Sequence, residues 1–157
     1  MWIATALTSS ADQTPAAKTA SDRALDWLKN AKPGKSTEWH ALRLLLHGNV
    51  GKIENEHKQL LSYQNKDGGW PWLIGGKSDA LATGLSIYAL RSASTPIQAP
   101  ALQRAAAYLI STQRNDGSWP VPGTKTKAKG KVVETAVYWG TGWATIGLTQ
   151  MLSHAPR

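Results

Sequence analysis

Residues 60–71, LLSYQNKDGGWP, and residues 109–120, LISTQRNDGSWP, are two copies of one pattern. The two glutamines, Gln64 and Gln113, are 49 positions apart, a spacing within the range of helical-hairpin repeats. In each copy an apolar segment with helical spacing precedes the pattern, and another follows it. The chain is therefore predicted to consist of repeated units, each with an outer helix, a turn and an inner helix.

The repeated pattern contains residue types that end one helix sharply and attach it to the next. An Asp-Gly pair supplies the positive φ that a sharp exit from a helix requires. A glutamine amide can hydrogen-bond to the backbone at a neighbouring helix end, and a tryptophan can cover it with a large apolar plane. We therefore expect a structural role for Gln64, Asp67, Gly68 and Trp70 in the first copy and for Gln113, Asp116, Gly117 and Trp119 in the second.

Outside the turns, the apolar spacing predicts an all-α fold of six helices in about three hairpins, the first pair being a worn copy without the turn pattern. These helices begin near residues 21, 36, 53, 78, 100 and 134. The only β-like trace is the short segment 131–133. Residues 1–20 are predicted to be a flexible N-terminal arm, and residues 21–157 a single repeat domain.

Composition restricts the classes of function. The 157 residues include no cysteine, which excludes disulfides, thiolate zinc sites and a cysteine nucleophile. No apolar stretch reaches the length of a membrane-spanning helix and no clear signal peptide is present, so the chain is expected to be soluble or peripheral, with its compartment open. The net charge of +8 favours acidic partners.

The densest run of positive charge lies in one long loop and contains Lys125, Lys127, Lys129 and Lys131. Such a run is usually a solvated loop, and here it can also meet an acidic partner or a lipid surface. Nucleic-acid binding is disfavoured, because basic residues are not repeated along one face beside aromatic residues or hydrogen-bond donors.

The two turns resemble the QW motifs of the squalene-hopene and oxidosqualene cyclases, and the chain is similar to a short, C-terminal-like module of that family. Residues 68–71 followed by Ser78 and Asp79 resemble the stretch that precedes the catalytic aspartate of these cyclases. Residues 116–119 and 138–142 resemble their later DGSW and YGTG segments. The resemblance implies the α/α-toroid fold that the cyclases share with the prenyltransferase repeat proteins.

The resemblance places Asp79 where the family has its central acid, but the neighbouring carboxylates of the bacterial DXDD motif are absent. The cysteine of the oxidosqualene cyclases and the DDxxD motif of class I terpene enzymes are absent as well. Ser78 or Asp79 can instead cap the helix that follows, and we prefer this interpretation to acid catalysis. No cofactor and no metal site is expected, because His40 and His47 lack a third ligand at metal-binding spacing.

Four aromatic residues are candidates for an apolar ligand pocket: Trp72, Tyr88, Trp139 and Trp143. Core packing accounts equally well for Trp139 and Trp143, whereas Trp72 follows the proline of the first turn and is expected at the loop mouth. Three hypotheses follow. The first is a non-catalytic module that contacts a protein partner or a second copy, for example as an accessory subunit, because three hairpins leave the ends of the array uncovered. The second is a binding module for an isoprenoid or other apolar lipid, and the third is a terpene-cyclase-like enzyme that uses Asp79 as its acid.

Overall fold

The computed structural model describes residues 2–9, 14–48, 54–123 and 130–152, which are mostly helical. Seven helices lie in these residues: α1 (Trp2–Ser9), α2 (Pro15–Asn30), α3 (Thr37–Gly48), α4 (Glu54–Ser62), α5 (Ala80–Ser92), α6 (Pro100–Thr112) and α7 (Glu134–Thr149). Helices α2 to α7 correspond to the six expected from the sequence. The prediction of an all-α fold is therefore confirmed, with one additional helix at the N-terminus.

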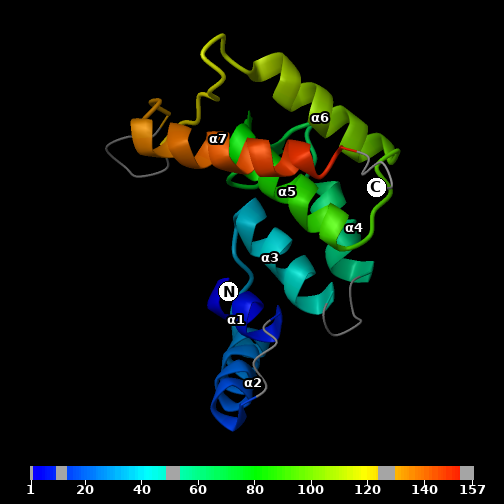
Figure 1. The fold of residues 1–157 in the computed structure, drawn as a ribbon, viewed down its shortest axis with the longest axis vertical. Coiled ribbons are helices and arrows are strands. Elements are labelled where there is room, and N and C mark those ends of the chain that lie inside the picture. The colour runs from blue at the N-terminus through cyan, green and yellow to red at the C-terminus, as the bar shows by residue number, and fades with distance from the viewer. Residues whose placement is uncertain (1, 10–13, 49–53, 124–129, 153–157) are drawn as a thin grey trace.

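Helix α5 is the centre of the fold. It packs against both α3 and α7, so that these three inner helices form a row through the molecule (Figure 1). Helix α4 packs on α3 and helix α6 packs on α5. The hairpins therefore follow one another in an open arc, and α7 is the last helix of the inner row in the described part of the chain.

Glycines allow α5 and α7 to approach each other closely. Gly84 on α5 lies against the backbone of Trp143 and Ala144, and a Cβ at Gly84 would be only 2.6 Å from the amide nitrogen of Ala144. On α7, a Cβ at Gly147 would be 2.7 Å from the carbonyl oxygen of Gly84. Neither position has room for a side chain, so these glycines set the distance between the two inner helices.

The N-terminal segment differs from the predicted flexible arm, because residues 2–9 and 15–20 are helical. Helix α2 begins at Pro15 rather than near residue 21. Thr14 is its N-cap, with the hydroxyl oxygen accepting a hydrogen bond from the amide of Ala17 at 3.3 Å, and Pro15 occupies the first helical turn. The Thr-Pro pair was the sequence signal for this start.

Helix α1 packs against α2 and α3. Ala4, Leu28 and Leu46 form the buried centre of this contact, which is separate from the main core around α5. Trp27, the residue before Leu28 on α2, is 69% exposed. Leu28 takes the inward position, so the large ring of Trp27 adds little to the core.

A short antiparallel pair of strands closes the loop between α4 and α5. Strand β1 (Trp70–Pro71) pairs with β2 (Ser78–Asp79), with Trp70 opposite Asp79. The backbone of the same loop bonds to the start of α3, where the amide of Thr37 donates to the carbonyl of Trp72 at 2.9 Å. The strand pair was not predicted, and it holds Asp79 at the first turn of α5.

Candidate functional site

The two turns have matching hydrogen bonds. Gln64 Nε2 donates to the carbonyl of Gly68 at 2.8 Å, and Gln113 Nε2 donates to that of Gly117 at 3.0 Å. The two glycines have φ values of 90° and 82°, as the Asp-Gly pattern predicts. The preceding aspartates, Asp67 and Asp116, each accept from the amide two residues further on, at 3.0 Å and 2.9 Å. The sequence repeat is therefore a repeat of structure.

The tryptophan of each turn attaches it to the outer helix before it. Trp70 Nε1 donates to the carbonyl of Leu60 at 2.7 Å, and Trp119 Nε1 donates to that of Leu109 at 2.8 Å. Both rings are buried, at 0% and 2% exposure. A buried indole whose N–H has a partner contributes apolar contact without an unsatisfied donor.

The turns differ in what covers them. Helix α6 covers the first turn, where Gln64 Nε2 also donates to the carbonyl of Ala101 at 2.8 Å and Arg104 Nη2 donates to Gln64 Oε1 at 2.6 Å. Gly68 lies directly against the backbone of Arg104. At the second turn, no described residue outside the turn lies within 4 Å of a Cβ placed on Gly117. The surface that α6 covers in the first repeat is uncovered by the described residues in the second.

Asp79 is the N-cap of α5 and both its carboxylate oxygens accept backbone hydrogen bonds. Oδ1 accepts from Ala82 at 2.8 Å, and Oδ2 accepts from Trp72 at 2.7 Å. The side chain is 4% exposed, and burial raises its pKa from the ordinary value of 3.8 to about 6, although the amides of Ala82 and Trp72 act in the opposite direction. Both oxygens are therefore held by donors that favour the charged carboxylate.

A cavity of about 830 Å³ lies along the inner helices, next to Asp79. Its walls come from α1, α3, α5 and α7 and from the loops after β1 and after Trp119. The lining residues are Trp2, Glu38, Trp72, Asp79, Leu81, Leu85, Val121, Pro122, Gly123, Val133, Thr135, Ala136, Trp139 and Trp143. The volume falls within the range of natural small-molecule sites, and the walls are largely apolar.

Three of the four aromatic pocket candidates line this cavity, namely Trp72, Trp139 and Trp143. The fourth, Tyr88, is not among the lining residues, but its ring packs edge-on against Trp143 at a centroid distance of 5.8 Å. Trp139 is 63% exposed, so it forms part of an open wall rather than filling the core. Tyr88 thus packs against a residue of the cavity wall without lining the cavity itself.

Sequence reasoning missed Trp2 and Glu38. The Trp2 ring stacks on Trp143 at 5.4 Å, and its Nε1 donates to Glu38 Oε1 at 2.9 Å. Helix α1 thereby contributes an aromatic wall across the inner face of the arc. An apolar start with a tryptophan was the available signal, but nothing local linked it to a residue 36 positions away.

None of the remaining candidates that the structure describes lines the cavity. Lys125, Lys127 and Lys129 lie outside the described residues, and Lys131 is exposed beside the bridge between Pro122 and Val132. His40 is buried against Tyr63, with a ring-centroid distance of 4.8 Å, and burial lowers its pKa. The side chain of His47 lies outside the described residues. Among the residues that the structure describes, no cluster of three or more metal-binding side chains occurs.

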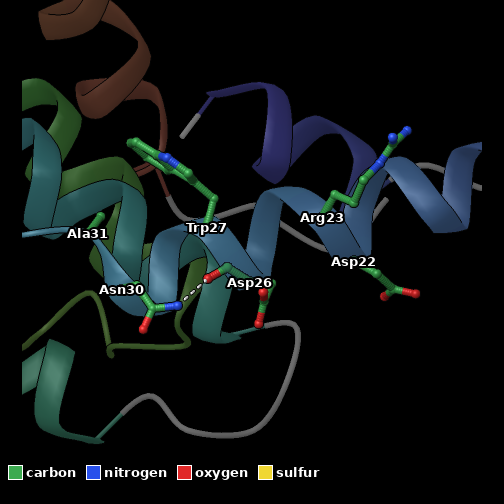
Figure 2. A pocket seen from close by; sticks show the side chains of 6 residues that line it. All are labelled: Asp22, Arg23, Asp26, Trp27, Asn30 and Ala31. Atoms are coloured by element: carbon green, nitrogen blue, oxygen red, sulfur yellow. Dashed lines mark hydrogen bonds between the residues drawn. The ribbon is translucent and has the colours of Figure 1, made fainter.

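A second hollow, of about 730 Å³, lies along α2. Its lining residues belong to this helix and its C-cap: Asp22, Arg23, Asp26, Trp27, Asn30 and Ala31. Figure 2 shows Trp27 on the opposite side of the helix from Asp22 and Asp26, so these side chains do not converge on one point. We assign no site to it. None of the helices in the described ranges is both long and apolar enough to span a bilayer.

The inner row of helices, the matched turns and the aromatic cavity define a helical-repeat protein of the α/α-toroid class. The family model described as the squalene-hopene cyclase N-terminal domain matches residues 36–112, from the start of α3 to the end of α6. Residues 36–112 are thus squalene-hopene cyclase-like. The match is to the N-terminal domain, whereas the motifs had indicated a C-terminal-like module. No curated protein matches the chain.

Proposed function

We propose that this chain is a non-catalytic squalene-cyclase-like module that binds an apolar small molecule in the cavity between its inner helices. The observation that carries the proposal is the cavity itself: about 830 Å³, with four tryptophans in its walls. Half of the eight tryptophans in the chain therefore line one space. Large exposed apolar walls cost free energy in water, and a ligand that covers them recovers it.

The bonding of Asp79 supports a non-catalytic role. An acid that protonates an alkene must be protonated and must direct that proton at the substrate. Here both oxygens accept backbone amide hydrogen bonds, which favour the charged carboxylate over the protonated acid. The carboxylate instead fixes the first turn of α5 and the loop after β1, which form one wall of the cavity.

The test is calorimetric titration with farnesol, an apolar isoprenoid alcohol. Thr135 is an exposed residue that lines the cavity mouth on α7, and Thr149 is exposed on the same helix outside the lining. We expect farnesol to bind the unchanged protein and Thr149→Trp equally, and Thr135→Trp at least tenfold more weakly. Equal affinity for all three proteins would place any binding elsewhere, and no binding to the unchanged protein would contradict the proposal.

A second candidate function, association with another helical chain, is favoured by the uncovered second turn. At the first turn, helix α6 packs against Gln64 and Gly68. Its Ala101 carbonyl and Arg104 guanidinium bond to the side-chain amide of Gln64. Gln113 and Gly117 offer the same groups without such a helix in the described residues. We propose a second copy as the occupant. Light scattering across a concentration series tests this, since a mass of 16.9 kDa throughout would contradict it.

A further inference from the structure

The charges that line the cavity are opposite in sign to the charge of the whole chain. The chain has 18 basic and 10 acidic residues, a net charge of +8. The described lining nevertheless contains two carboxylates, Glu38 and Asp79, and no lysine, arginine or histidine. A random sample of this surface would contain more basic than acidic groups, so the cavity differs from the remainder of the surface.

Like the two carboxylates, the aromatic walls of the cavity favour a cationic ligand. Among the aromatic side chains, the face of an indole ring attracts cations most strongly, over a distance of about 6 Å. Trp2 and Trp143 stack at 5.4 Å, and Trp72 and Trp139 line the same space. Trp139 is 63% exposed and Trp2 is 42% exposed, so part of each ring is accessible to a ligand.

Glu38 lies where it can attract a cation together with the ring of Trp2. It lies in the first turn of α3, and its Oε1 accepts the indole N–H of Trp2 at 2.9 Å. The hydrogen bond fixes the ring and places a negative charge at its edge. Polarisation of an N–H donor by a carboxylate increases the electron density of the ring system, and ring and carboxylate then attract a cation together.

We infer that the natural ligand is a cationic amphiphile, a tertiary or quaternary ammonium group attached to an apolar chain, taken up as a free molecule. This inference rests on the proposed function and narrows it. The ammonium group of the ligand lies among Trp2, Glu38 and the neighbouring tryptophans. Its alkyl chain covers the apolar wall of Leu81, Leu85 and Val133. A neutral counterpart of such a ligand binds through its alkyl chain alone.

The test compares three probes with the same alkyl chain below their micelle concentrations: decyltrimethylammonium, 1-decanol and decanoate. We expect calorimetry to give an affinity for the ammonium about tenfold above that for the alcohol, and the weakest affinity for the carboxylate. Equal binding of ammonium and alcohol would overturn the inference and leave the proposed function intact. Absence of binding by all three would overturn both.

Matched variants locate the effect. Glu38→Gln keeps an oxygen that accepts the Trp2 N–H but removes the charge, and we expect it to reduce ammonium affinity severalfold with alcohol affinity unchanged. Glu54→Gln removes one charge from an exposed residue of α4 outside the cavity and should alter neither affinity. Equal effects of the two variants would attribute the preference to overall charge. Co-sedimentation of the protein with phosphatidylcholine vesicles, at the ammonium concentration used in the titration, would contradict uptake of a free molecule.

Discussion

The side-chain amide of Gln64 donates a hydrogen bond to the carbonyl of Ala101, 2.8 Å away on the first turn of α6. The bond joins the turn between α4 and α5 to the outer helix of the next hairpin, and Arg104 donates to the oxygen of the same amide. Gln113 occupies the equivalent position in the second repeat but bonds only within its own turn in the described structure. One residue type therefore has an inter-helix role in the first repeat and a local role in the second.

This difference predicts unequal effects of the same substitution. Gln64→Ala removes the side-chain bonds to the carbonyls of Gly68 and Ala101 and the bond from the guanidinium of Arg104, and we expect a loss of about 1–3 kcal/mol in the free energy of unfolding. Gln113→Ala removes a bond at an exposed position and should cost about 1 kcal/mol or less. Urea titration of the two variants measures both values, and equal losses would contradict the assignment.

The tryptophans of the chain are predicted to differ widely in their contribution to stability. Trp70 is fully buried and its indole N–H is bonded, so Trp70→Ala should cost about 3–5 kcal/mol. Trp27 is 69% exposed on α2, and Trp27→Ala should change stability by about 0.5 kcal/mol or less. Thermal unfolding of both variants is the measurement, and a large loss for Trp27→Ala would show that α2 packs differently.

Two glycines of the inner helices should respond to alanine in opposite directions. Gly84→Ala forces a methyl group into the backbone of α7, so we expect severe destabilisation with separation of α5 from α7. A Cβ on Gly142 meets nothing within 4 Å, and Gly142→Ala should stabilise the helix by up to about 1 kcal/mol. Circular dichroism during urea unfolding distinguishes the outcomes, and tolerance of alanine at position 84 would refute the close packing.

Asp79 should give the stability a specific dependence on pH. Its folded pKa of about 6 lies above its ordinary value of 3.8, so between these values the folded state binds more protons than the unfolded state. The contribution of Asp79 to the free energy of unfolding therefore decreases as the pH rises from about 4 to about 6. The stability difference between the unchanged protein and Asp79→Asn should be more favourable to the unchanged protein at pH 4.5 than at pH 7. A difference that is constant with pH would contradict the raised pKa.

The repeat turns could be predicted from the sequence because their bonds are local. Gln64 and Gly68, or Trp70 and Leu60, are close in the chain, and their residue types determine their partners. The predicted start of α2 near residue 21 was wrong although Thr14 and Pro15 are ordinary helix-start residues, because the residues around them are polar and show no helical period of apolar side chains. The two-residue strands were missed since a pair this short has no period to detect.

The candidate site was predicted only in part. Trp139 and Trp143 were identified because they are four residues apart on the last inner helix, and Trp72 was identified because it follows the proline of the first turn. Trp2 and Glu38 depend on a contact between segments 36 positions apart, and no local pattern encodes it. The contribution of loop residues 121–123 to the cavity wall similarly depends on the path of the chain after Trp119. Such contacts are decided by the packing of whole elements.

The central claim, that the cavity is a ligand site, is tested most directly by the indole N–H signals of the eight tryptophans in a two-dimensional NMR titration with farnesol, assigned by single Trp→Phe variants. We predict that the signals of the four cavity residues, Trp2, Trp72, Trp139 and Trp143, shift with a common saturation curve. The signals of Trp27, Trp70 and Trp119 should remain in place. Shifts that are absent, or as large at exposed Trp27 as at the four cavity residues, would contradict the account.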